Sequence, residues 1–482
     1  MAPDADPHAG PSAGPFAHDG APADLTAVVD RLAGHGVRGV SIGWVDNNGI
    51  VRSRTVPLSQ LEATARRGVG ITAVFAVFDS HDGITFAHDG LSTPSGDVRL
   101  LPVLDPDDEL AGIVPLPGQP GLAWVSGRQV SADGETWPYC QRAVLERQVE
   151  VAAEAGFGVR AGFEVEMTLG VDPGVEGGAE LVPAHRGPAY SPKALLDVDE
   201  FVVQLLGDLA EAGVPVGQVH AEYGGAQVEL AIAPLEPLAA ADAQVLVRQL
   251  VHAAARAHGL RASLAPLTTT DGAGNGWHLH TSLVDLDTGA NVLHGDGPYG
   301  LSDDGAGYVA GLLRELPGLV GVTAPSTGSL MRRRPHYWAG AYGCWGVENR
   351  EAALRLVPPT RLVGAEATNV ELKASDASAN PYLSLAVVIA AGLAGVRDGA
   401  ALPEPVQEDV GGWSDEQRAA AGIAALPTDY ADQQAALLGC DLVRDVLGRR
   451  LFGAFLACRD ADQAWIGEQS VEQVVSSLRW LY

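Results

Sequence analysis

The sequence has few cysteines and no long hydrophobic segment. Its four cysteines are Cys140, Cys344, Cys440 and Cys458, and no two of them have CxxC spacing. A disulfide framework is therefore excluded in a chain of 482 residues, and a zinc site built from thiolates is disfavoured. The longest apolar helical stretch, residues 383–396, is too short to span a bilayer, so we expect no membrane partner.

The sequence is also short of basic residues. Lysine and arginine total 31 against 60 aspartate and glutamate residues, which gives a formal net charge of −29. Because an acidic surface repels nucleic acids and anionic membranes, we expect neither as a partner. No basic segment followed by an apolar one opens the chain, so we expect no signal peptide and a cytoplasmic protein. Solubility is the simplest explanation of the acidic charge, which would also attract a cationic substrate.

Hydropathy patterning predicts an α+β fold with more than one domain. Residues 1–24 are rich in Ala, Pro, Gly, His and Asp and are expected to be a disordered tail. Residues 25–130 are expected to form a small domain made mostly of sheet, and a polar stretch at 131–138 opens a larger domain over 131–482. Strands are expected at 37–45, 50–56, 71–78, 98–103, 122–125 and 159–169, and helices at 142–155, 198–212, 239–257 and from 414 onward.

Four short stretches place polar residues two positions apart. Residues i and i+2 of a β-strand point to the same face, so each stretch would present a polar pair on one side of a sheet and apolar residues on the other. The pairs are Glu164 with Glu166, Gln227 with Glu229, His278 with His280, and Glu371 with Lys373.

Three of these stretches have ordinary structural explanations when each is taken alone. Glu164 and Glu166 could be the exposed face of a half-buried edge strand. Residues 222–229 surround a Gly-Gly turn and could be a hairpin with a solvated face. Glu371 and Lys373 could be a surface ion pair.

Taken together, the stretches provide ligands for metal ions. His278 and His280 follow the glycine-rich segment 272–276, which allows a backbone to approach a ligand closely. Five glutamates and one histidine are an oxygen-rich ligand set for two hard divalent cations, Mg²⁺ or Mn²⁺. Such a pair of ions could hold the phosphates of a nucleotide during phosphoryl transfer.

A group of arginines follows these stretches. Planar guanidinium groups suit carboxylates and phosphates, and aromatic neighbours such as Tyr337 and Trp338 indicate a partly buried site rather than a salt-bridged surface. The arginines are Arg332, Arg333, Arg334, Arg350 and Arg355.

In this order the motifs resemble those of the glutamine synthetase family, which includes the γ-glutamyl–amine ligases. The resemblance runs from about residue 25 to the C-terminus and is densest over 162–395. The motifs that carry it are Gly162-Phe-Glu164-Val-Glu166, His220-Ala-Glu222-Tyr-Gly-Gly-Ala-Gln227-Val-Glu229, Gly274-Asn-Gly276-Trp-His278-Leu-His280-Thr-Ser282, Arg332 to Ala339, Glu348-Asn349-Arg350 with Arg355, and Glu371-Leu-Lys373-Ala-Ser-Asp376-Ala-Ser-Ala-Asn380-Pro381-Tyr382.

The resemblance implies a role for most of these residues. One metal ion would be bound by Glu164, His278 and Glu371, and the other by Glu166, Glu222 and Glu229. ATP would be contacted by His280, Ser282, Arg350 and Arg355, and glutamate by Gly274 and Arg332.

The resemblance also implies a fold, an assembly and a reaction. The fold would be an N-terminal β-grasp-like domain followed by a larger α+β catalytic domain. The assembly would be a large homo-oligomer, commonly a dodecamer, with active sites between adjacent subunits. In the reaction, the γ-carboxylate of glutamate would attack ATP to form an acyl phosphate, and an amine would then displace phosphate to form an amide. Arg350 would neutralise charge on the transferred group.

Trp338 departs from the family pattern. Members that use ammonia have a glutamate at this position, which helps to accept a proton from ammonium. An indole cannot accept that proton, but it can present its π-face to an alkylammonium group. We therefore expect Trp338 to face an amine substrate larger than ammonia, such as a polyamine or a small alkanolamine.

Two further positions leave the substrate contacts open. Lys373 stands where an arginine that contacts glutamate is usual, and it lacks the bidentate fork. The acid substrate would then be held differently, or would not be glutamate itself. An acidic residue of the N-terminal domain is expected to reach a neighbouring subunit's site, and Asp79 and Asp82 are both candidates.

Two alternative functions stay open from the sequence. An ammonia-using glutamine synthetase is disfavoured by Trp338. An inactive structural or regulatory relative would have no need of the six metal-ligand positions, all of which are filled, or of Arg332, Arg350 and Arg355.

Overall fold

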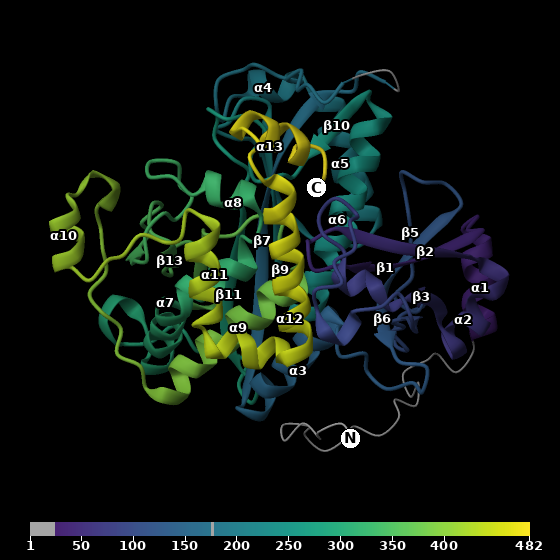
Figure 1. The fold of residues 1–482 in the computed structure, drawn as a ribbon, viewed down its shortest axis with the longest axis horizontal. Coiled ribbons are helices and arrows are strands. Elements are labelled where there is room, and N and C mark those ends of the chain that lie inside the picture. The colour runs from purple at the N-terminus through teal and green to yellow at the C-terminus, as the bar shows by residue number, and fades with distance from the viewer. Residues whose placement is uncertain (1–24, 175–177) are drawn as a thin grey trace.

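The computed structural model describes residues 25–174 and 178–482 of the chain. The tail predicted over residues 1–24 lies outside the described residues. Two sheets organise the described part, one of six strands in the N-terminal region and one of eight strands in the rest (Figure 1). This combination of helices and sheets confirms the predicted α+β fold.

The six-stranded sheet is mixed and β-grasp-like. Its main order is β2-β1-β6-β4-β3, with β5 paired to β6. The central pair, β1 and β6, is parallel, whereas the other pairs are antiparallel. Its strands are β1 (Gly39–Val45), β2 (Val51–Pro57), β3 (Val69–Thr72), β4 (Asp97–Pro102), β5 (Val114–Pro115) and β6 (Leu122–Val130), and its helices are α1 (Leu25–Gly34) and α2 (Leu61–Arg67).

One strand predicted for this region is wrong over most of its length. The segment 71–78 leaves the sheet after Thr72 and forms a 3₁₀ helix over Ala73–Val77. Ala73, Val74, Ala76 and Val77 are all buried, which a strand facing the core on one side would not achieve. The polar stretch 131–138 follows β6 directly, and a domain boundary at 130/131 stays our proposal.

The eight-stranded sheet carries the predicted acidic motifs. Its order is β12-β13-β14-β11-β7-β9-β8, with β10 paired to β7. Figure 1 shows β7 running through the middle of the molecule. The strands are β7 (Phe157–Val171), β8 (Val216–Ala221), β9 (Gln227–Leu235), β10 (Leu260–Ser263), β11 (Trp277–Asp285), β12 (Trp345–Val347), β13 (Leu354–Val357) and β14 (Asn369–Leu372).

Helices surround this sheet and agree with the segments predicted from periodicity. The C-terminal part is helical, as expected, and the long α12 crosses the front of the view in Figure 1. The helices are α3 (Gln141–Glu154), α4 (Pro192–Leu196), α5 (Asp199–Glu211), α6 (Pro237–Ala257), α7 (Asp303–Thr323), α8 (Thr327–Arg332), α9 (Pro381–Asp398), α10 (Asp415–Ala420), α11 (Tyr430–Leu438), α12 (Asp441–Ile466) and α13 (Val471–Leu478).

The apolar helix α9 is longer than the sequence pattern indicated. It has 18 residues and starts at the N-cap Asn380, whose side chain accepts hydrogen bonds from the backbone N–H groups of Tyr382 and Leu383. Among the described residues it is the one helix whose length and composition would allow it to cross a membrane, yet 78% of it is buried inside the fold. Length therefore does not exclude a membrane span here, and burial identifies α9 as a core helix.

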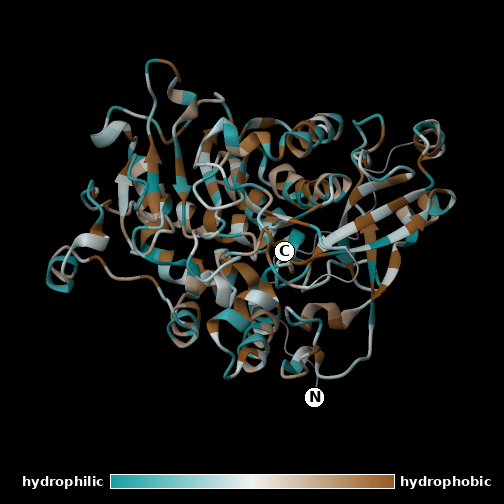
Figure 2. Cartoon of the chain, turned by 90° about the horizontal axis from the view of Figure 1, so that it is seen from above, coloured by the Kyte–Doolittle hydropathy of each residue, from teal (hydrophilic) through white to brown (hydrophobic). Residues whose placement is uncertain are grey.

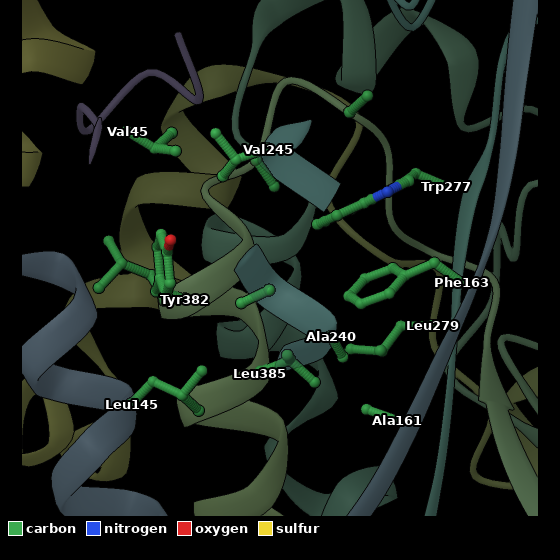
Figure 3. Close-up of a cluster of buried hydrophobic side chains, with 14 of the residues drawn as sticks. Val45, Leu145, Ala161, Phe163, Ala240, Val245, Trp277, Leu279, Tyr382 and Leu385 are labelled. Carbon is green, nitrogen blue, oxygen red and sulfur yellow. The ribbon is translucent and has the colours of Figure 1, made fainter. Parts of the chain in front are cut away.

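Strands β7 and β11 of the eight-stranded sheet have one apolar and one polar face. Phe163 on β7 stacks on Trp277 of β11, with ring centroids 4.3 Å apart. Figure 3 shows these rings and Leu279 pointing toward Tyr382 and Leu385 of α9. Hydrophobic and hydrophilic residues also alternate along many other helices and strands, as the brown and teal segments of Figure 2 show. Glu164 and Glu166 alternate with the apolar residues of β7, and His278 and His280 alternate with those of β11. These four residues therefore point to the opposite face of the sheet.

The turn between β1 and β2 joins the two halves of the structure. The turn covers residues 46–49, between the strands predicted at 37–45 and 50–56, and these four residues are buried. The side-chain amide of Asn380 donates to the carbonyl oxygens of Val45 and Asp46, at 3.1 and 3.0 Å. Arg248 of α6 donates to the carbonyl oxygen of Gly49 at 2.8 Å. The hairpin tip is thus fixed to the start of α9.

Substitution of Gly49 by alanine should destabilise the protein through contact with this segment. Gly49 has φ of 73°, and a Cβ atom there would lie 2.4 Å from the carbonyl oxygen of Ser378. Gly36 is the matched control, because its φ is 80° but a Cβ would meet nothing within 4 Å. We expect Gly49→Ala to lower the free energy of unfolding by about 1–3 kcal/mol more than Gly36→Ala. Equal loss in the two variants, measured by chemical denaturation, would contradict this.

Candidate active site

Strand pairing brings the predicted polar residues onto one face of the eight-stranded sheet. Each of them lies between residues that face the core, so alternation turns them to the other side. The register then sets them opposite one another on neighbouring strands. The cross-strand pairs are His278–Glu164, Glu166–Glu229, His220–Glu229, His280–Glu371 and Arg355–Glu371.

These side chains surround a cavity of about 610 Å³. Glu371 is fully buried and is held beside the cavity by Arg355 and Lys373. Most of the residues predicted from sequence therefore meet at one place. Those that line the cavity are Glu164, Glu166, Glu222, Glu229, Gly274, His278, His280, Arg332, Trp338, Arg350, Arg355 and Lys373.

The first group of possible metal ligands centres on Glu164. Its two carboxylate oxygens lie 3.0 Å from Nδ1 of His278 and 3.4 Å from Nε2 of His280. Glu371 completes the group, with Oε1 3.4 Å from Nδ1 of His278. One ligand atom each from Glu164, His280 and Glu371 lie within 4.8 Å of one another. Both histidines therefore meet at this group.

The charges of this group stabilise its carboxylates in the ionised form. Burial raises the pKa of Glu164, but the hydrogen bonds and charges of His278 and His280 outweigh burial and lower it. Burial likewise raises the pKa of Glu371, and the charges of Lys373 and the two histidines reverse that effect. The carboxylates are ready to bind a cation.

The second group consists of Glu166, Glu222 and Glu229, whose ligand atoms also lie within 4.8 Å of one another. Oε2 of Glu166 accepts hydrogen bonds from the backbone N–H of Gly276 at 2.7 Å and from Gln227 at 2.9 Å. Burial raises the pKa of Glu222, and the charges of Glu166 and Glu229 raise it further. Oε2 of Glu222 is buried and has no hydrogen-bond partner in the described part of the chain.

Divalent metal ions fit this arrangement. Three carboxylates within contact distance repel one another unless a cation lies among them. The orphaned oxygen of Glu222 is a free ligand atom of the kind that Mg²⁺ and Mn²⁺ prefer. Glu164 and Glu166 are neighbours on one strand face, yet they belong to different groups of possible ligands. The division of these residues between two metal ions stays a prediction.

The basic residues of the cavity lie beside the first group. Lys373 and Arg355 contact the two oxygens of Glu371, at 2.7 and 2.9 Å. Glu371 and Lys373 are 0% and 3% exposed, so this is a buried pair rather than the surface ion pair considered above. Arg332 is buried, with Nη2 3.5 Å from Nε2 of His278. Gly274 lies against it, and a Cβ there would come within 2.8 Å of the Arg332 side chain.

Trp338 lies at the rim of the cavity. It is 36% exposed, and its ring is perpendicular to that of Tyr223, with centroids 4.7 Å apart and an interplanar angle of 70°. Its φ of 52° is unusual for a bulky residue. The backbone N–H of Trp338 donates to Oε1 of Glu351 at 3.2 Å. Strained backbone of this kind concentrates at functional sites.

Sequence reasoning missed several lining residues. The hydroxyl of Tyr190 donates to Glu222 at 2.9 Å, and Asn369 contacts Nδ1 of His280 at 2.9 Å. Hydrogen bonding to Glu229 raises the pKa of His220 to about 9. Tyr223 and His220 belong to a motif that was noted for its glutamates, so the motif itself could have pointed to them. Tyr190 and Asn369 are isolated in sequence and gave no signal.

Besides Glu371, three predicted residues do not line this cavity. Ser282 is on the same strand face as His280 but one step further along β11. Asp79 accepts hydrogen bonds from the backbone of His81 and Gly83, at 2.9 and 2.7 Å. Asp82 is paired with Arg52 at 2.6 Å. The role of either aspartate at a neighbouring subunit stays a prediction.

Comparison with known proteins gives the family. Residues 138–475 match the model of the glutamine synthetase catalytic domain. The chain belongs to the glutamine synthetase family. This confirms the predicted fold, with its β-grasp-like N-terminal domain, and the class of carbon–nitrogen ligases. Enzymes of this family use ATP and divalent metal ions.

Individual relatives cover nearly the whole chain. A γ-glutamylpolyamine synthetase, GlnA3, of Streptomyces coelicolor is 41% identical over 95% of this chain and 96% of its own. A γ-glutamylanilide synthase of an Acinetobacter species is 26% identical over 95% and 93%. A glutamine synthetase of Halobacterium salinarum is 29% identical over 91% and 92%.

Solved structures agree with this assignment. The crystal structure of a novel glutamine synthase homologue aligns with a TM-score of 0.80 and 32% identity, covering 92% of this chain and 99% of that one. GmaS without ligand aligns with a TM-score of 0.79 and 25% identity, covering 93% and 98%.

The second metal group can be tested at Glu166. Glu166→Gln keeps the side-chain shape and removes one carboxylate charge, so metal binding measured by calorimetry should weaken. We expect turnover to fall by about 100-fold or more, as for loss of a charged group that acts on the transition state. Glu236→Gln, an exposed residue beyond the end of β9, is the control and should change neither. Unchanged metal affinity in Glu166→Gln would contradict this assignment.

Proposed function

We propose that this protein joins the γ-carboxylate of glutamate to an organic primary amine, with a polyamine as the favoured class, through a γ-glutamyl phosphate. The observation that carries this proposal is Trp338 at the rim of the cavity, where ammonia-using relatives have a glutamate. The similarity to a γ-glutamylpolyamine synthetase supports the same conclusion.

The residues in and beside the cavity would serve each part of the first step. Arg332 and Gly274 would bind glutamate, and His280, Ser282, Arg350 and Arg355 would contact ATP. Glu164, His278 and Glu371 would hold one metal ion and Glu166, Glu222 and Glu229 the other. Bound Mg²⁺ or Mn²⁺ would supply positive charge for the phosphates.

The residues of the chain would then act mainly by position and charge. The γ-carboxylate attacks the γ-phosphate of ATP, and ADP leaves. Arg350 lines the cavity and would offset negative charge on the transferred phosphoryl group. The amine then attacks the acyl carbon, phosphate departs, and the amine loses a proton as the amide forms.

The aromatic rim suits an alkylammonium group. Trp338 and Tyr223 both line the cavity and form an edge-to-face pair. A cation at an aromatic face gains about 0.5–2 kcal/mol. Glu351 hydrogen-bonds to the backbone of Trp338, and burial raises its pKa. The formal charge of −29 would draw a polycation toward the protein.

The remaining parts of the proposal concern the acid substrate, the assembly and the compartment. Lys373 lines the cavity beside Glu371 and would hold the acid substrate as a point charge rather than a fork. A homo-oligomer, with a dodecamer as the family pattern, would place Asp79 or Asp82 near a neighbouring site. We propose the cytoplasm as the compartment.

A panel of amines tests the choice of substrate. Phosphate release should be measured with ATP, glutamate and Mg²⁺ or Mn²⁺, using ammonium, monoamines, diamines and polyamines, with products identified by mass. Polyamines or small organic amines should be the best substrates. Robust turnover with ammonium alone would indicate an ordinary glutamine synthetase, and no ATP-dependent reaction with any amine would indicate an inactive relative.

Trp338 can be tested by two substitutions. Trp338→Glu removes the π-face and supplies a proton acceptor, so kcat/KM for the best amine should fall about tenfold while ammonium turnover rises. Trp338→Phe keeps an aromatic face and should retain most activity with the amine. Equal activities of Trp338→Glu and the parent protein across the amine panel would exclude a role for this residue in amine choice.

A further inference from the structure

A second cavity lies between the N-terminal sheet and α6. Its volume is about 860 Å³, larger than that of the candidate active site, and the two cavities share no lining residue. Its walls come from the β2 hairpin, the segment 118–124, one side of α6 and the C-terminal residues Leu481 and Tyr482. It therefore lies where the N-terminal region contacts the rest of the chain, and it is separate from the candidate active site.

One wall of this cavity is basic. Arg248, His252 and Arg256 line it at intervals of four residues, so they form a stripe along one face of α6. The two arginines carry the charge of this stripe, because desolvation by the surrounding protein and the charge of Arg248 lower the pKa of His252 to about 4. Within residues 25–174 and 178–482, no aspartate or glutamate side chain lines this cavity. In a protein with a formal charge of −29, such a basic lining is unusual and favours an anion.

Arg248 is a buried cation without a carboxylate partner in the described chain. It is 6% exposed, and its Nη atoms donate to the carbonyl oxygens of Gly49 and Ala379, at 2.8 and 3.3 Å. Its Nε atom is buried and has no hydrogen-bond partner within residues 25–174 and 178–482. Burial lowers the pKa of Arg248 to about 10, against the weaker charges of Tyr482 and Asp376. Buried charges are normally paired, so this arrangement lacks a counter-ion.

Neutral donors lie around the same cavity. Gln119, Gln249 and Ser53 line it, and Arg256 and His252 are exposed at its open side. Guanidinium groups and neutral donors are the groups that commonly bind phosphates and carboxylates. Their two positive charges would balance an anion of charge −2.

We propose that this cavity binds a small dianion, either a phosphate compound or a dicarboxylate, and that the bound ligand is coupled to the active site. Arg248 provides the link, because its guanidinium lies 5.3 Å from the ring of Trp277. Trp277 precedes His278, and it stacks on Phe163, which precedes Glu164 (Figure 3). A ligand that shifts the Arg248 side chain would thus affect Trp277 and Phe163, which adjoin His278 and Glu164 of the first metal group.

Calorimetry on the full chain tests the binding site. Inorganic phosphate and succinate are the probes that separate the two sources of a dianion, and sodium chloride at matched ionic strength is the blank. At least one probe should bind, and Arg256→Ala should weaken it by about tenfold or more, as expected for loss of a charged hydrogen-bond donor. Arg256 is exposed, so the variant should fold normally. Arg160→Ala, which removes an exposed arginine of β7, is the matched control and should bind as the parent does.

A second variant separates this site from phosphate binding in the active site. Arg350→Ala should leave the Arg256-dependent binding intact even where turnover is lost, so failure of the proposed function would not mimic failure of this inference. Coupling predicts that saturating probe changes the apparent affinity for Mg²⁺ and that Mg²⁺ changes probe affinity by the same factor. Absence of binding, or binding that Arg256→Ala does not weaken, would overturn the site, and identical Mg²⁺ affinity with and without probe would overturn the coupling.

Discussion

The antiparallel pairing of β7 with β11 is the constraint on which the rest of the site depends. Its register sets His278 opposite Glu164 on one face and brings Phe163 and Trp277 into contact on the other. A shift of one residue would exchange the faces and bury the carboxylates in the core. The aromatic stack therefore stabilises the fold and fixes the position of the ligands at the same time.

The acidic face that results would be unfavourable without compensation. Three carboxylates meet at the second group, and Glu371 is fully buried at the first. The chain itself offsets part of this charge, because Lys373, Arg355 and the two histidines surround Glu371 and Glu164. Among the described residues, the second group has His220 beside Glu229 and His278 beside Glu166, and it would depend more on bound metal ions.

The two halves of the structure are joined through polar contacts that also reach the site. The buried tip of the β1–β2 hairpin bonds to Arg248 and to Asn380, the cap of α9. Arg248 in turn lies on Trp277, next to the metal ligand candidate His278. The N-terminal region is therefore positioned to influence the eight-stranded sheet. The basic cavity between them is where we propose that a small dianion binds.

The sequence by itself determined the features that follow from local periodicity and chemistry. The alternation of Glu164 and Glu166 with apolar residues specified a two-faced strand, and the order of motifs specified the family. Most helices were predictable, because their caps and apolar spacing are local. The 3₁₀ helix at Ala73–Val77 was not, since an apolar run fits either a strand or a buried turn.

The tertiary structure decided whatever depends on contacts between distant segments. It turned the Glu371–Lys373 pair from a possible surface contact into a buried one and brought Tyr190 and Asn369 to the site. It also buried the hairpin turn and left Arg248 without a carboxylate partner among the residues that the structure describes. The physical reason is that burial and charge pairing arise only when segments far apart in sequence pack together, and no local pattern records which partner each side chain will meet.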